Sequence, residues 1–96
     1  MKAKHAILAV FCMGLAAPAA AQSLAPPGAA ACSGCHAPAQ LGSPVPPIRG
    51  RDAKEIVQAM HEFRSGARPA TVMDRIAKGF SDDETQAIAA WLSAQK

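Results

Sequence analysis

Residues 32–36 read Cys-Ser-Gly-Cys-His, which places two thiols three positions apart and a histidine directly after the second thiol. Thiols at this spacing reach the two vinyl groups on one edge of a porphyrin and form thioethers, and the next imidazole then lies below the iron. The two residues between the thiols are small, so the backbone can pass close to the ring. The motif therefore predicts one haem c, attached through Cys32 and Cys35, with His36 as an axial ligand.

Two other kinds of site contain Cys-x-x-Cys: a redox dithiol and one half of a zinc site. A redox dithiol usually lies in a β-α-β unit, and the sequence has no strand pattern. A tetrahedral zinc site needs further Cys or His ligands, and beyond the motif residues 22–96 offer only His61. Both alternatives fit the sequence less well than a haem.

Residues 1–21 have the pattern of a secretory signal peptide. A basic start precedes an apolar run of about 12 residues and an Ala-x-Ala cleavage site that ends at Ala21. The apolar run is shorter than the roughly 20 residues of a membrane-spanning helix. We expect cleavage after Ala21, export to the periplasm, and a mature cytochrome-like domain of residues 22–96 without a membrane span.

The mature chain is small and nearly neutral. Residues 22–96 carry eight basic and seven acidic side chains, a net charge of +1. The basic residues are scattered and aromatic residues are few, which argues against a nucleic-acid partner. A domain of about 75 residues buries a marginal core and usually needs disulfides, a metal or a large cofactor, and a haem meets that need.

The sequence predicts an all-α domain of three to four helices. Two capping boxes, Asp52 with Glu55 and Ser81 with Glu84, mark helix starts. Gly34 is expected to loosen the first helix. The helices are expected at about residues 26–32, 52–64, 71–78 and 81–96, and a proline-rich loop at residues 37–50.

The coordination position opposite His36 has several candidates. Met73 follows a proline-containing connector and lies 37 residues after His36, enough chain to cross the haem edge. Met60 and His61 lie in a predicted helix, where Met60 shares an apolar stripe with core positions. We favour Met73 and keep Met60, His61 and an open position as alternatives. A Met and His pair raises the reduction potential and saturates the iron, which favours electron transfer over catalysis.

Loop residues are candidates for contacts around the haem. An axial histidine usually donates its second N–H to a carbonyl or carboxylate. The carbonyl of Pro44 is our first candidate to accept from His36, and that of Pro46 is the alternative. Arg49 and Arg51 are candidates to neutralise haem propionates, although ordinary solvated charges explain them equally well.

The order of these elements resembles class I cytochrome c: a first helix, the Cys-x-x-Cys-His motif, a proline-bearing loop, a methionine ligand and a last helix. The resemblance implies a small all-α fold around one covalently bound haem c. It also implies that the first and last helices cross near the haem edge, with Trp91 at or near the crossing.

A narrower resemblance covers roughly residues 46–94. Residues 63–66 read Phe-Arg-Ser-Gly, and residues 70–81 read Ala-Thr-Val-Met-Asp-Arg-Ile-Ala-Lys-Gly-Phe-Ser. These stretches resemble the cytochrome subunit of flavocytochrome c sulfide dehydrogenase, which has a Phe-Lys-Ser-Gly-like segment and Thr-Ile-Met-x-Arg-Ile-Ala-Lys-Gly-Tyr-Ser. The resemblance implies Met73 as a ligand and an FAD-containing flavoprotein partner that oxidises sulfide. Many members have two haem domains, whereas this chain has one motif.

Three functions are compatible with these features. The first is the electron-accepting cytochrome subunit of a sulfide dehydrogenase, which passes electrons to a downstream cytochrome or oxidase. The second is a free cytochrome that carries electrons to a terminal oxidase or reaction centre, although a near-neutral charge gives little electrostatic steering. The third is a gas-binding or catalytic haem protein with an open sixth position.

Overall fold

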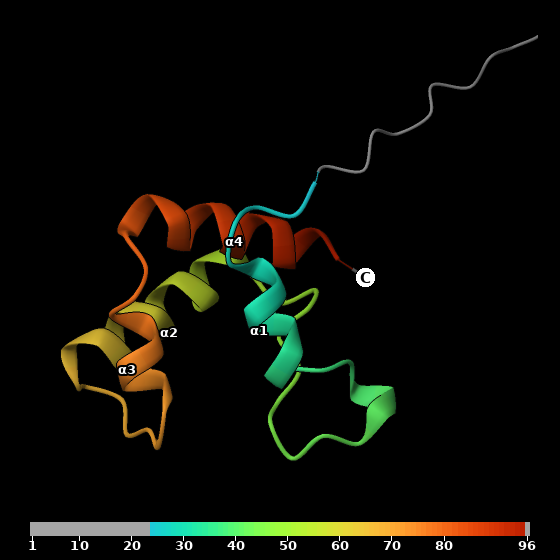
Figure 1. The fold of residues 1–96 in the computed structure, drawn as a ribbon, viewed down its shortest axis with the longest axis horizontal. Coiled ribbons are helices and arrows are strands. Elements are labelled where there is room, and N and C mark those ends of the chain that lie inside the picture. Colours follow the sequence, from blue (N-terminus) through green and yellow to red (C-terminus); the bar gives the residue numbers. More distant parts are fainter. Residues whose placement is uncertain (1–23, 96) are drawn as a thin grey trace, which may run out of the picture.

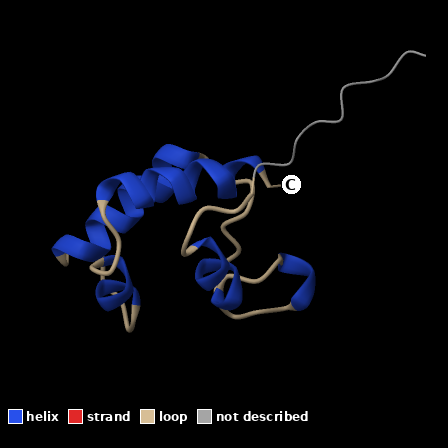
Figure 2. Ribbon diagram, turned by 45° about the horizontal axis from the view of Figure 1, so that its top comes forward, coloured by secondary structure: helices blue, strands red, loops and turns tan. Residues whose placement is uncertain are grey.

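The computed structural model describes residues 24–95, so the predicted signal peptide and its cleavage site lie outside the described chain. The described residues form helices and loops without any strand (Figure 2). The elements are α1 (Ala29–Cys35), a 3-10 turn (Ala39–Leu41), α2 (Ala53–Ser65), α3 (Met73–Ala77) and α4 (Asp82–Ala94). The prediction of an all-α fold is confirmed. Within this range no helix has the length and apolar character needed to cross a bilayer.

Helix α4 joins α1 to the α2–α3 pair, because among the described helices α1 does not pack against α2 or α3. Helix α2 packs against α3 and α4, whereas α1 packs against α4 alone. In Figure 1, α4 runs along the top, with α2 and α3 below one end and α1 below the other. The helix that bears the cysteines and the helix that begins at Met73 are therefore held on opposite sides of a space.

The helix starts follow the predicted caps, with one difference. The Asp52 carboxylate accepts two backbone N–H groups of the first turn of α2, at 2.8 and 3.3 Å. Glu55 does not complete the predicted capping box, and its carboxylate instead lies 3.6 Å from the guanidinium of Arg51. At α4 the capping box is complete, because Ser81 accepts from the Glu84 N–H at 3.2 Å and the Glu84 carboxylate accepts from the Ser81 N–H at 2.8 Å.

Helix α1 begins later and ends later in the sequence than predicted. It passes through Gly34 to Cys35, and the His36 N–H closes its last turn on the Cys32 carbonyl at 2.9 Å. A glycine inside a helix costs only about 1 kcal/mol relative to alanine. The hydrogen bond from the His36 N–H to the Cys32 carbonyl helps to offset this cost. Helix α3 is shorter than the predicted span of 71–78.

The chain buries few side chains of its own. Among residues 24–95 the buried apolar residues are Ala29, Ala77, Ile88, Ala89 and Leu92, three of which are alanines. Trp91 is half-buried and packs against the cluster that Ala29, Ile88 and Leu92 form between α1 and α4, close to the predicted position. The expectation of a marginal core is confirmed.

Gly28, at the N-terminus of α1, has φ +88°, and a Cβ added there would lie 2.5 Å from Cε1 of Phe80. We expect Gly28→Ala to lower the free energy of unfolding by about 2–4 kcal/mol, since left-handed strain adds to displacement of the Phe80 ring. Gly42→Ala is the matched control, because Gly42 has φ +65° with open space around it. Denaturant unfolding of the haem-loaded variants measures both. Equal losses would show that the Phe80 contact contributes nothing.

Candidate haem site

Two adjoining hollows occupy the space between α1 and the α2–α3 pair. Their volumes are about 160 and 240 Å³, and together they reach the range of cofactor-sized pockets, about 300–1,000 Å³. Both are lined by His36, Ile48, Ile56, Met60 and Met73. The sequence-predicted ligands thus meet at one site from two segments that are distant in the chain.

The last turn of α1 presents both thiols to this site. Cys32 and Cys35 line the smaller hollow, and Cys32 is half-buried whereas Cys35 is exposed. Burial raises the pKa of the Cys32 thiol above its ordinary value, against a weaker opposing effect of a backbone hydrogen bond.

The ring of His36 is held by the proline-rich loop. Its Nδ1 lies 2.6 Å from the carbonyl oxygen of Pro46, so Nδ1 carries the proton and Nε2 is the nitrogen available to a metal. The first candidate, Pro44, was therefore wrong and the alternative was right. The Ser43 hydroxyl anchors the loop to α1 by donating to the Cys35 carbonyl at 3.5 Å. The chain then bends at 44–45, which makes Pro46 the residue whose carbonyl reaches the ring.

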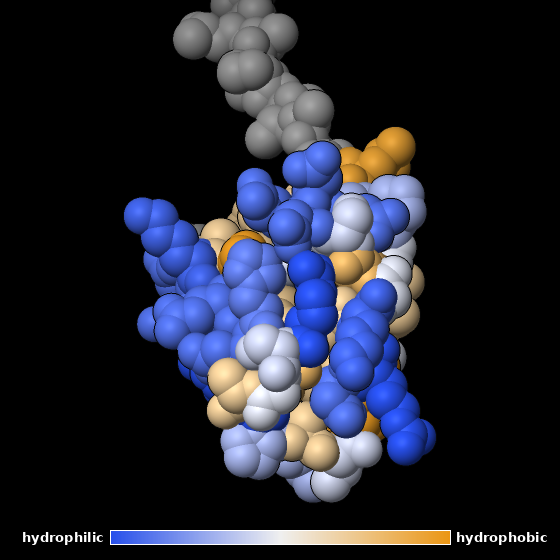
Figure 3. All heavy atoms as spheres, turned by 90° about the vertical axis from the view of Figure 1, so that its left-hand side faces the viewer, coloured by the Kyte–Doolittle hydropathy of each residue, from blue (hydrophilic) through white to orange (hydrophobic). Residues whose placement is uncertain are grey.

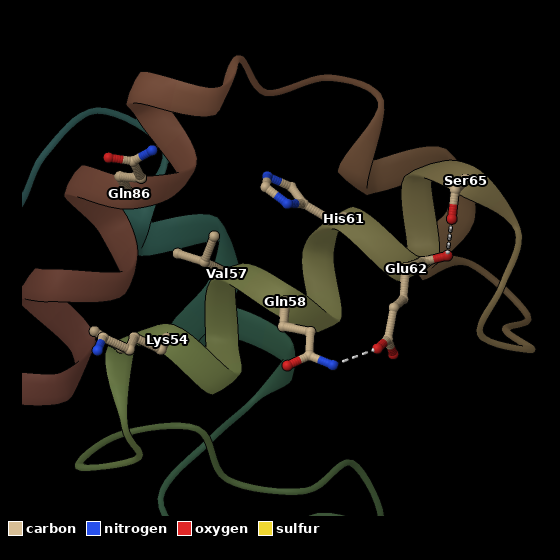
Figure 4. A pocket seen from close by; sticks show the side chains of 8 residues that line it. Lys54, Val57, Gln58, His61, Glu62, Ser65 and Gln86 are labelled. Carbon is tan, nitrogen blue, oxygen red and sulfur yellow. Dashed lines mark hydrogen bonds between the residues drawn. The ribbon is translucent and has the colours of Figure 1, made fainter.

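The structure distinguishes among the candidates for the second axial position. Met73 is the first residue of α3 and Met60 lies within α2, and both line the two hollows. His61 lies instead on a groove between α2 and α4 (Figure 4). Its Nε2 lies 3.4 Å from Oδ1 of Asp82. The structure thus places His61 away from the hollows and leaves two methionines beside them.

Arginines lie beside the larger hollow. Arg51 lines it, as its predicted role requires, whereas Arg49 lines neither hollow. Arg68 also lines it, and its guanidinium lies 2.7 Å from the Glu62 carboxylate. Sequence reasoning missed Arg68 because it follows Gly66, where α2 ends, and no periodicity links it to that helix. The chain reverses direction after α2, and this reversal places Arg68 beside the larger hollow.

These features fit a haem. The hollow is lined almost wholly by apolar side chains that do not fill it, two thiols lie at its edge, and His36 has one free nitrogen. Residues 24–95 contain no group of three or more His, Cys, Asp or Glu side chains arranged to bind a metal ion, so they offer no ligand set for the zinc alternative.

No protein-family model matches the chain, but its sequence is similar to those of known electron-transfer proteins. The chain is 40% identical over 76 residues to a thiosulfate dehydrogenase electron acceptor of Stutzerimonas stutzeri, covering 76% of this chain and 35% of that protein. It is 39% identical over 59 residues to the cytochrome subunit of sulfide dehydrogenase of Chlorobaculum tepidum, covering 60% and 54%.

A third relative is a thiosulfate dehydrogenase electron acceptor of Thiomonas intermedia, 34% identical over 96 residues, with 94% of this chain and 44% of that protein covered. The chain thus spans between a third and about half of the length of these relatives. Together with the Cys-x-x-Cys-His motif at the end of α1 and the all-α fold, these similarities support a cytochrome c of the kind that these relatives represent.

Proposed function

We propose that the protein transfers single electrons in the periplasm through one haem c, with thioethers to Cys32 and Cys35 and axial ligation by His36 and Met73. The observation that carries the proposal is the convergence of these residues on one apolar hollow. A bound haem supplies an iron that accepts and releases one electron. Periplasmic location rests on the predicted signal peptide of residues 1–21.

The residues around the hollow have separate tasks in this proposal. The hydrogen bond from His36 to the Pro46 carbonyl fixes the ring and makes its Nε2 a stronger ligand. With haem bound, a thioether from Met73 would saturate the iron and favour the ferrous state, and the apolar lining would further disfavour the more highly charged ferric centre. A saturated iron has no position for a substrate, so we assign an electron-transfer protein and not an enzyme.

The proposed electron donor is a dehydrogenase of a reduced sulfur compound. Two relatives are named electron acceptors of thiosulfate dehydrogenase and one a cytochrome subunit of sulfide dehydrogenase. For the sulfide enzyme the partner is an FAD-containing flavoprotein subunit, and electrons leave to a downstream cytochrome or oxidase.

The surface beside the attachment site supports a stable contact with such a partner. Residues 24–48 contain no Lys, Arg, Asp or Glu, and Leu41 is 73% exposed there. Uncharged apolar surface is typical of the centre of a protein–protein interface, whereas a free carrier gains more from a strongly charged face.

Reduction assays test this function directly. The ferric protein is mixed with thiosulfate dehydrogenase and thiosulfate, or with a flavoprotein sulfide dehydrogenase and sulfide, and the haem spectrum is followed. We expect rapid reduction with one of these enzymes and little without enzyme. If ascorbate reduces the haem but neither dehydrogenase accelerates reduction, the sulfur-enzyme role is wrong and a free carrier becomes the better assignment.

A further inference from the structure

Met73 lies in the middle of a connecting segment, residues 66–81, between α2 and α4. Within the described chain, the hydrogen bonds of residues 69–79 stay inside the segment, as in the Arg75 N–H to Val72 carbonyl bond at 3.0 Å. Apolar packing also holds the segment in place, since Ala77 is fully buried. Polar anchoring of Met73 therefore depends on the two ends of the segment.

Arg64 of α2 anchors the far end. Its Nη2 donates to the Phe80 carbonyl at 2.7 Å, and its Nη1 donates to Oδ1 of Asp82 at 2.6 Å. The Arg64 side chain thus binds both Phe80, which follows α3, and Asp82, the first residue of α4. The hydrogen bond and charge of Arg64 hold the pKa of Asp82 below its usual range, with a smaller contribution from His61. The Arg64 side chain is 31% exposed and that of Asp82 is 64% exposed, so solvent screens the ion pair more than the part-buried hydrogen bond to the Phe80 carbonyl.

The near end is anchored with more redundancy. Arg68 pairs with Glu62 at 2.7 Å and lies 5.5 Å from the centre of the Phe63 ring. Its backbone N–H also donates to the Glu62 carbonyl at 3.2 Å, a bond that survives any change of side chain. At the far end the polar contacts with α2 come from two side chains, Arg64 with its two hydrogen bonds and His61, which lies 3.4 Å from Asp82.

The Phe80 position matters for the haem hollow as well. Its ring lines the smaller hollow beside Ile88 and approaches Gly28 at the start of α1. Hydrophilic side chains cover most of the α2–α3 end of the molecule (Figure 3), so water competes for every polar contact there. Loss of the Arg64 contact would free the segment at its solvent-facing end.

We propose that Arg64 is a positioning residue for Met73: by fixing the Phe80 carbonyl and Asp82 to α2, it holds the thioether at the hollow. This inference rests on the proposed ligation by His36 and Met73. Opening of the segment without unfolding of the helices is the event that Arg64 suppresses.

The test compares Arg64→Gln with Arg75→Gln in the haem-loaded protein. Arg75 is an exposed residue of α3, so its variant removes the same charge without the two hydrogen bonds. Imidazole, which must displace the thioether to reach ferric iron, is titrated into each. We expect about tenfold tighter imidazole binding for Arg64→Gln and no change for Arg75→Gln, because hydrogen bonds to charged groups contribute on this scale.

A second readout separates positioning from general stability. In Arg64→Gln the thioether-to-iron charge-transfer band should disappear on heating before the far-ultraviolet helix signal does, and Arg64→Lys should recover part of the difference. If the variant does not fold, Asp82→Asn removes the negative charge of one acceptor, leaves the bond to the Phe80 carbonyl, and should shift imidazole affinity in the same direction by less. Imidazole affinity equal to that of Arg75→Gln, with band and helix lost together, would overturn the role of Arg64. A wild-type protein without the band would overturn Met73 ligation itself.

Discussion

Met73→Ala should lower the reduction potential of the haem by about 100 mV or more and allow the reduced protein to bind carbon monoxide. The thioether stabilises ferrous iron relative to ferric iron, so its loss favours oxidation. An alanine leaves the coordination position opposite His36 to water or to an added ligand. Redox titration and carbon monoxide difference spectra measure the two effects.

Met60→Ala is the matched control, since Met60 lines the same hollows from α2. It removes the same side chain from the site and should cost stability by leaving a cavity, with no carbon monoxide binding. The reverse result, an open iron in Met60→Ala and a closed one in Met73→Ala, would make Met60 the ligand. Ready carbon monoxide binding by the native protein would instead support the gas-binding or catalytic alternative.

Replacing Cys32 and Cys35 together by serine should abolish covalent haem attachment and, in haem-free protein, most of the helical structure. Among residues 24–95 only two large apolar side chains are buried, Ile88 and Leu92, and they contribute about 1.5–3 kcal/mol each. Ordering the backbone costs about 1–2 kcal/mol per residue, so this core alone cannot hold the fold. Helix α1 would separate first, because it packs only on α4.

Two measurements check this expectation. Extraction with acidified organic solvent should remove the haem from the double variant, and far-ultraviolet circular dichroism should then report loss of helix. Cys35→Ser alone is the control, because the thiol of Cys32 keeps one thioether and should keep the haem bound during extraction. A haem-free double variant with full helical signal would show that the protein core suffices without the cofactor.

Much of the fold follows from local sequence. The caps at Asp52 and Ser81 set the starts of α2 and α4, and Gly66 ends α2 with φ +82°. These signals act between residues in the same turn, so the sequence reports them directly. The Glu55 prediction was wrong for the same local reason, since Arg51 offers a charge one turn away.

The sequence by itself predicts the attachment chemistry. Cys32, Cys35 and His36 lie within one turn of chain, so their relative placement depends on local backbone geometry and little else. Only the tertiary structure decided two further contacts. The Pro46 carbonyl accepts a hydrogen bond from the His36 ring, and Arg64 donates to the Phe80 carbonyl in the segment that carries Met73. Those contacts join residues 10 and 16 positions apart, and such distances are fixed by how loops fold back, which no local pattern encodes.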